Sequence, residues 1–141
     1  MSNPVHRTRI AAYGVAISAG NVLLTRASER SDVPGTWWLP GGGIDFGEQP
    51  SEAVVREFAE EAGVQTRIVR LLDVVSTVAD RPPPFADERV HTLRVIFEVE
   101  VIGGELRPES DGSSDRVAWV PLEQTDVLPV MSFFKPFLSR S

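Results

Sequence analysis

Three glutamates, Glu57, Glu60 and Glu61, lie within five residues of one another. If the segment is helical, each residue advances by about 100°, so the three carboxylates share one face. Like charges at this spacing destabilise a helix by about 0.2–0.5 kcal/mol per pair unless a cation lies among them. Mg²⁺ and Mn²⁺ prefer carboxylate oxygens and keep water in their coordination shell. The cluster therefore predicts a divalent-metal site, and a solvated acidic helix face is the alternative.

Two neighbouring features favour the metal site. Arg56 directly precedes the cluster and can pair with Glu52, one turn earlier, or with Glu48 in the preceding loop. That loop starts with glycines at 41–43, whose bare backbone lets a polyphosphate or metal ion approach closely. It closes with Gly47-Glu48-Gln49, whereas a P-loop requires Gly-Lys-Ser/Thr, so that class of phosphate site is excluded.

The helix that must carry these side chains has clear ends. Pro50 suits the first helical position, and Gly63 suits the residue just after the last one. Val54, Phe58 and Ala62 recur every four residues and form an apolar stripe beside the acidic face. The sequence predicts a helix over residues 50–62 with its carboxylates at the edge of the core.

The remaining elements are predicted mainly as strands. We interpret the apolar runs 10–19 and 22–24 as a hairpin turning at Gly20-Asn21, and a secretory signal is the alternative for the first run. Val- and Ile-rich segments predict two long strands, 68–78 and 90–102. The other predicted elements are short strands at 37–39 and 117–120, loops at 79–89 and 109–115, and a terminal helix at 131–138. We find no repeat or linker, so we predict one α+β domain over residues 1–141.

Composition excludes several classes of function. The chain of 141 residues has a formal net charge of −6, which disfavours nucleic acid and anionic membranes as partners. It has no cysteine, so disulfides, thiol catalysis and cysteine-ligated metals are excluded. No stretch approaches the roughly 20 apolar residues that a membrane helix needs. We therefore expect a cytoplasmic protein with a small-molecule partner.

Residues 42–64 resemble the Nudix box, a pattern of Gly, five residues, Glu, seven residues, and Arg-Glu-hydrophobic-x-Glu-Glu-x-Gly-hydrophobic. The matching residues are Gly42, Glu48, Arg56-Glu57-Phe58, Glu60-Glu61 and Gly63-Val64. Segments 38–42 and 119–122 also resemble the family. The resemblance implies a Nudix-type α/β/α sandwich with a mixed β-sheet. It also implies hydrolysis of a pyrophosphate bond in a nucleoside diphosphate linked to another group, by water attack on phosphorus.

The resemblance also implies roles for individual residues. Glu57, Glu60 and Glu61 would bind Mg²⁺ or Mn²⁺, and Glu57 would also act as the base. Arg56 would orient Glu57 through a salt bridge. Further candidate ligands are the Gly41 carbonyl and Glu48. Members of the family often supply another acid from outside the box, for which Glu98, Asp111 and Asp115 remain open candidates.

Substrate contacts are less well defined by the sequence. Trp37 and Trp38 could stack on a nucleobase, although one could equally face the core, and Arg26 could contact a phosphate or be solvated. We favour a nucleoside triphosphate as substrate, including an oxidised one. Nucleotide sugars and ADP-ribose are alternatives, as is a non-catalytic nucleotide sensor or interaction module. A homodimer is left open.

Overall fold

A mixed sheet forms the centre of the computed structural model, which describes residues 4–110 and 112–139. Its four strands run in the order β5 (Gly41–Gly43), β1 (Val5–Val15), β7 (Glu88–Gly104) and β6 (Val64–Asp80). β1 and β7 pair in parallel, whereas β5 with β1 and β6 with β7 are antiparallel. The predicted α+β fold with a mixed sheet is confirmed.

A second sheet is built around β3 (Asn21–Ala27), which pairs with β2 (Ile17–Ser18), β4 (Trp37–Trp38) and β8 (Ser114–Pro121). The hairpin prediction is correct only for β2 and β3, where Ile17 pairs with Val22. The run 10–19 is instead divided at Ala16 between the two sheets, because β1 pairs along its length with β7. Sequence pattern alone does not reveal this distant partner.

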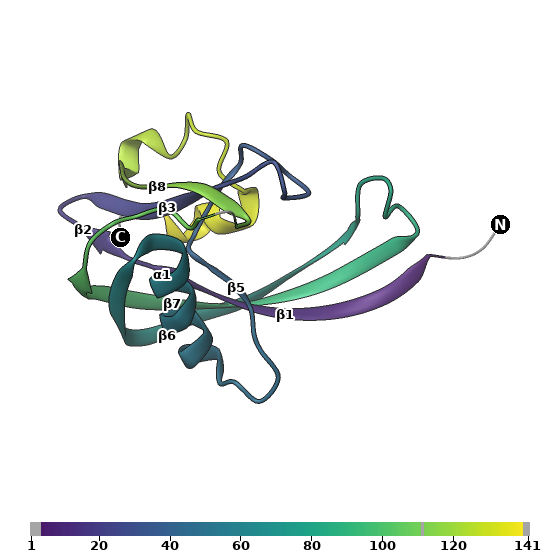
Figure 1. Ribbon diagram of the computed structural model, residues 1–141, viewed down its shortest axis with the longest axis horizontal. Coiled ribbons are helices and arrows are strands. Elements are labelled where there is room, and N and C mark those ends of the chain that lie inside the picture. The colour runs from purple at the N-terminus through teal and green to yellow at the C-terminus, as the bar shows by residue number, and fades with distance from the viewer. Residues whose placement is uncertain (1–3, 111, 140–141) are drawn as a thin grey trace.

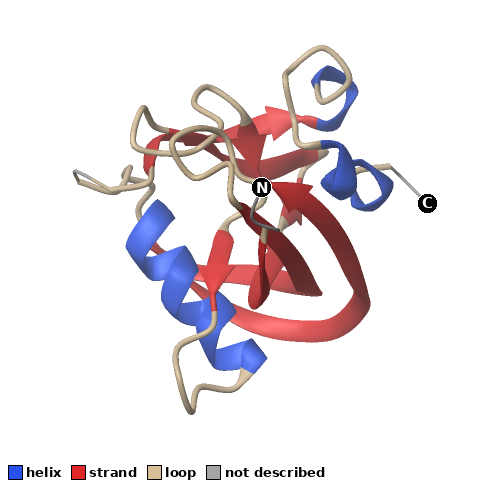
Figure 2. Cartoon of the chain, turned by 90° about the vertical axis from the view of Figure 1, so that its right-hand side faces the viewer, coloured by secondary structure: helices blue, strands red, loops and turns tan. Residues whose placement is uncertain are grey.

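Helix α1 (Pro50–Ala62) covers one face of the mixed sheet. Its Val54 and Phe58 are fully buried against a cluster that includes Phe97 of β7. The opposite face packs against the second sheet and the 3-10 helix η2 (Ser132–Phe137), where Phe134 is fully buried. Figure 2 shows α1 and the 3-10 turns on opposite sides of the strands. The continuous apolar run of β7 is therefore covered on both faces, as such runs indicate.

The helix prediction is confirmed at both ends, and Gly63 adopts the left-handed φ of 75° that ends the helix. β6 and β7 extend further than predicted, pairing from Val64 opposite Gly104 to Asp80 opposite Arg89. With β1 they form an arm that projects beyond the rest of the molecule (Figure 1). The predicted terminal helix is a 3-10 helix, because Pro136 lacks the N–H that a continuing α-helix would use.

A short 3-10 helix, η1 (Leu122–Gln124), follows β8 and precedes η2 in the chain. Within that part of the chain, no helix combines the length and hydrophobicity needed to cross a bilayer.

Candidate active site

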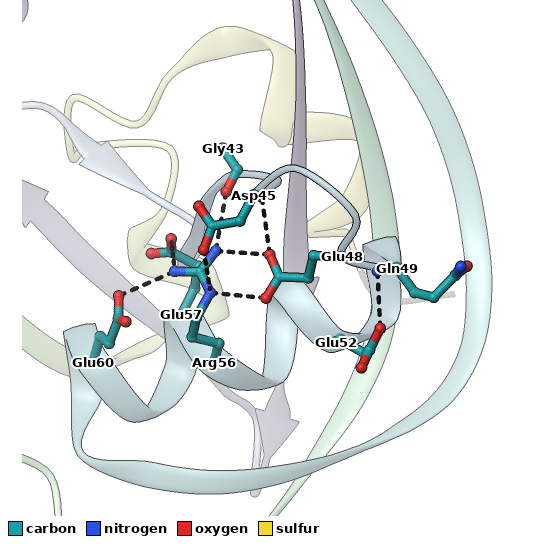
Figure 3. Close-up of polar contacts among 8 residues, drawn as sticks. All are labelled: Gly43, Asp45, Glu48, Gln49, Glu52, Arg56, Glu57 and Glu60. Atoms are coloured by element: carbon teal, nitrogen blue, oxygen red, sulfur yellow. Dashed lines mark hydrogen bonds and ion pairs between the residues drawn. The ribbon is translucent and has the colours of Figure 1, made fainter.

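Arg56 is the centre of the acidic cluster (Figure 3). Its Nε and Nη2 donate to the two carboxylate oxygens of Glu48 at 2.9 and 3.0 Å, so this pair is bidentate. Its Nη1 donates to Glu57 at 2.8 Å and to Glu60 at 3.2 Å. Nη2 also donates to the Gly43 carbonyl at 3.1 Å. Arg56 therefore pairs with Glu48, the second of the two partners left open by the sequence. It also links α1 to residues 41–49, here called the glycine loop, although Gly41–Gly43 form strand β5 rather than the predicted loop.

The other predicted partner, Glu52, has a different role. Its carboxylate accepts a hydrogen bond from the backbone N–H of Gln49 at 2.9 Å, which satisfies a free donor at the start of α1. The backbone N–H of Asp45 donates in turn to Glu48 at 3.0 Å. The loop between β5 and α1 is thus held in one conformation before any ligand binds.

Glu61 lies deeper than the other carboxylates. It is 7% exposed, and its Oε2 accepts a hydrogen bond from the backbone N–H of Gly41 at 3.0 Å. A Cβ at Gly42 would come within 3.0 Å of Oε1 of Glu57, so the absence of a side chain there leaves room for the carboxylate. The glycine loop and the acidic helix face are therefore in direct contact.

Burial and mutual repulsion shift the ionisation of these groups. Burial, followed by the charge of Glu57, raises the pKa of Glu61 well above its usual range. Burial also raises the pKa of Glu57, although the hydrogen bond and charge of Arg56 oppose the shift. Arg56 has the opposite effect on Glu48, whose pKa it lowers through a hydrogen bond. Burial and the neighbouring carboxylates thus disfavour the charged forms of Glu57 and Glu61, and Arg56 opposes this effect only at Glu57.

A glutamate that the sequence analysis did not single out adds to this charge. Glu109, in the loop between β7 and β8, raises the pKa of both Glu57 and Glu61 through its negative charge. Its Oε1 is buried and has no hydrogen-bond partner among the residues that the structure describes. The sequence does mark a loop at 109–115, but nothing local distinguishes Glu109 from the other acids near it.

The three acids predicted as candidates outside the box have other positions. Glu98 of β7 pairs with Arg70 at 2.7 Å. Asp115 of β8 forms a bidentate pair with Arg26, with distances of 2.8 and 3.1 Å. Asp111 lies outside the described residues. Arg26 is therefore paired on the second sheet rather than directed at the acidic cluster.

The donor set suits a hard divalent cation. It combines several carboxylates with a buried oxygen of Glu109 that lacks a partner, and such oxygens are the ligands that Mg²⁺ and Mn²⁺ prefer. Within residues 4–110 and 112–139, however, no three acidic or histidine side chains converge on a single point. Arg56 forms ion pairs with the half-exposed Glu60 and with one oxygen of Glu57.

A cavity of about 200 Å³ opens beside Glu61, Gly41 and Gly42. Trp38 and Tyr13 line it, with ring centroids 6.2 Å apart, and Ser114 contributes a buried Oγ without a partner. Trp37 is 8% exposed and packs in the core instead. Of the two tryptophans predicted as stacking candidates, the structure brings only Trp38 to this cavity.

The fold and the arrangement of the acidic helix against the glycine loop define a Nudix-type domain. Residues 7–140 match the family model of the NUDIX domain. Over 102 residues the chain is 36% identical to an ADP-ribose pyrophosphatase of Methanocaldococcus jannaschii, an alignment that covers 72% of this chain and 56% of that protein. The chain belongs to the Nudix family.

Two further comparisons give a range of relatives. The chain is 30% identical to nucleoside triphosphatase NudI of Escherichia coli, over 72% of this chain and 73% of that protein. A MutT NUDIX hydrolase from Burkholderia pseudomallei has a TM-score of 0.77 at 24% identity, covering 93% of this chain and 95% of that one. The chain spans 56% of the length of the Methanocaldococcus jannaschii relative, and 41% and 24% of two further curated relatives that it matches.

Proposed function

We propose that the protein hydrolyses a pyrophosphate bond in a nucleoside diphosphate linked to another group, using a divalent metal ion. The observation that carries this proposal is the pair of buried carboxylates, Glu57 and Glu61, set against a glycine loop with a third acid, Glu109, beside them. Burying these like charges destabilises the fold unless a cation joins them. A bound divalent cation would supply the positive charge that the site lacks, and the same cation would bind the phosphate groups of the substrate.

We assign the following roles to the residues of the site. Glu57 and Glu61 would hold Mg²⁺ or Mn²⁺, with Glu60, Glu48, Glu109 and the Gly41 carbonyl as further candidate ligands. When bound, the metal neutralises charge that develops on the phosphate and lowers the pKa of attacking water. Glu57 would accept the proton from that water. Arg56 would orient Glu57, to which it donates at 2.8 Å.

The cavity beside Glu61 is our candidate site for the rest of the nucleotide. Trp38 offers an aromatic face, and the unpaired Oγ of Ser114 offers a hydrogen bond. We favour a nucleoside triphosphate, including an oxidised one, over a nucleotide sugar or ADP-ribose. The named relatives include both a nucleoside triphosphatase and an ADP-ribose pyrophosphatase.

The proposal is tested by incubating the purified chain with Mg²⁺ or Mn²⁺ and a panel of nucleotides at mildly alkaline pH. The panel contains triphosphates, ADP-ribose, nucleotide sugars and dinucleotides, and chromatography resolves the products. We expect metal-dependent cleavage of at least one class. Thermal stabilisation by a nucleotide without cleavage of any compound would instead identify a non-catalytic sensor.

A further inference from the structure

Within residues 4–110 and 112–139, Arg94 of β7 is a buried cation without a carboxylate partner, and the phenol of Tyr13 is its neighbouring acidic group. Arg94 is 6% exposed, and its Nη1 donates to Thr77 Oγ1 at 2.7 Å. Its guanidinium lies 3.8 Å from the centre of the Phe133 ring. Its Nε is buried and has no hydrogen-bond acceptor. A buried charge whose donors are only partly hydrogen-bonded destabilises the folded state. Burial accordingly lowers the pKa of Arg94.

A second cation, Arg9 of β1, lies on the same face of the sheet. β1 and β7 are parallel and pair Ala11 with Arg94, so Arg9 projects to the same side two residues earlier. The charge of Arg9 also contributes to lowering the pKa of Arg94, though less than burial does. Arg9 is half-buried and makes no ion pair within the described residues.

Both arginines line a cavity of about 410 Å³ on the sheet face away from α1. The carboxylates of this cavity already have cationic partners at 2.9–3.0 Å, namely Glu88 with Arg7, Asp32 with Arg81, and Asp80 with Arg89. Arg9 and Arg94 therefore have no carboxylate partner among the described residues that line this cavity. The cavity is suited to an anion.

This basic cavity adjoins the cavity beside Glu61. Arg9 and Trp38 line both cavities, so they form the boundary between them. Nη2 of Arg9 lies 3.5 Å from the position that a Cβ of Gly43 would occupy, which places its tip at the glycine loop. A molecule whose pyrophosphate lies against the acidic cluster can therefore extend past Arg9 towards Arg94.

We propose that Arg94 and Arg9 form an anion subsite that binds a third phosphate of the substrate, beyond the two that flank the cleaved bond. The planar guanidinium fork matches the geometry of phosphate oxygens. The preferred substrate then carries three phosphates, as a nucleoside triphosphate does, rather than a neutral sugar after the second. This inference rests on the proposed function for the position of the pyrophosphate.

The first test measures the binding of inorganic tripolyphosphate and of pyrophosphate to the purified full chain by isothermal titration calorimetry. For Arg94→Gln, we expect the Kd for tripolyphosphate to rise about 10-fold or more, because a charge-assisted bidentate contact is lost. The Kd for pyrophosphate changes less. Arg9→Gln, at a half-buried side chain, shows the same selective loss and decides the question if Arg94→Gln does not fold.

Arg67→Gln is the matched control. Arg67 makes a bidentate pair with Glu100 on the surface, at 3.0 and 3.2 Å, and lines neither cavity. This variant should bind both anions like the unmodified chain. Equal losses for both anions in the Arg94 and Arg9 variants, or no loss in either variant, would overturn the subsite.

The second test compares kcat/KM for a nucleoside triphosphate, for ADP-ribose, and for ADP-ribose phosphorylated on its terminal ribose. A selective loss for the triphosphate in Arg94→Gln shows that the third phosphate belongs to the polyphosphate chain. A selective loss for the phosphorylated sugar shows that it belongs to the distal group, and a loss for neither overturns the subsite.

Failure of the subsite is distinguishable from failure of the proposed hydrolysis. If no nucleotide is cleaved but tripolyphosphate binding still depends selectively on Arg94, the subsite stands and the hydrolytic function is wrong. If nucleotides are cleaved and both arginine variants bind the two anions unchanged, the hydrolytic function stands and the subsite is wrong.

Discussion

Arg56 shows how a single side chain organises the acidic cluster. Its fork contacts both oxygens of Glu48, while its remaining donors reach Glu57 and Glu60 on α1. Several hydrogen bonds to carboxylates raise the pKa of Arg56 above its usual value, the bond to Glu48 contributing most. Arg56 thus balances part of the acidic charge and also fixes the orientation of Glu57.

We predict that Arg56→Lys lowers kcat about 10- to 100-fold, the range found when a group that orients a metal ligand is replaced. Lysine keeps the charge but cannot form the planar fork that contacts Glu48 and Glu57 together. Steady-state kinetics at several Mg²⁺ concentrations measure the effect. Arg67→Lys, which changes a bidentate pair far from the cluster, is the control. Equal activity in the two variants would contradict the orienting role.

Glu61 should make the stability of the metal-free protein depend on pH. Its pKa is raised by burial from a usual value of 4.5, so the folded state holds this proton more tightly than the unfolded state does. Its contribution to stability is fully present below pH 4.5 and is lost as pH rises through the raised pKa. Arg56-bound Glu48, with a lowered pKa, has the opposite dependence.

We therefore predict that Glu61→Gln increases the free energy of unfolding of the metal-free protein at pH 8, by about 1–3 kcal/mol. The difference from the unmodified chain should shrink as pH falls towards 4.5. Urea unfolding at a series of pH values, with a chelator present, measures this difference. A variant that is less stable than the unmodified chain at pH 8 would show that the negative charge of Glu61 does not destabilise the folded state.

At the scale of elements, the loop between β7 and β8 carries an acid whose charge acts on two carboxylates of α1. Its Glu109 acts electrostatically on Glu57 and Glu61, whereas Glu98, within β7, is paired with Arg70. We predict that Glu109→Gln lowers kcat or weakens activation by Mg²⁺ about 10-fold or more, as loss of a ligand or of its orienting partner does. Titrating activity with Mg²⁺ measures both effects.

Glu98→Gln is the matched control for this loop, since it removes a carboxylate of the same size from a neighbouring segment. It should leave kcat and the Mg²⁺ dependence close to those of the unmodified chain. If Glu98→Gln is the more damaging of the two, the acid outside the box has been assigned to the wrong element.

Local features of the sequence could be predicted because neighbouring residues determine them. Pro50, Gly63 and the four-residue apolar spacing specify α1, and the same spacing places its glutamates on one face. Distant contacts could not be predicted in this way. The parallel pairing of β1 with β7, and the approach of Glu109 to α1, depend on segments separated by many residues.

The two tryptophans illustrate the same limit. Alternation along a strand requires Trp37 and Trp38 to face opposite sides, but it does not say which side is the core. Only the packing of the second sheet buries Trp37 and leaves Trp38 to line the cavity beside Glu61.

At the scale of the whole molecule, the acidic cluster and the basic cavity adjoin, and Arg9 and Glu61 line one common cavity. α1 and its carboxylates lie on one face, while Arg9 and Arg94 lie on the other, and β1 with the glycine loop connects them. A chain of formal charge −6 thus keeps a local basic cavity next to an acidic cluster. A polyphosphate with its metal ion fits this arrangement, because the metal ion suits the acidic cluster and the phosphate groups suit the basic cavity.

The most direct test of the central claim measures Mg²⁺-dependent nucleotide cleavage by the unmodified chain and by Glu57→Gln. We predict that cleavage by Glu57→Gln falls by about 10²–10⁴-fold, because the proton acceptor for attacking water is lost, with the fold retained by circular dichroism. Glu52→Gln, on the same helix but with its carboxylate bonded to the backbone N–H of Gln49 at the helix start, should keep its activity. Unchanged cleavage and unchanged Mg²⁺ dependence in Glu57→Gln would contradict the assignment of this cluster as the catalytic centre.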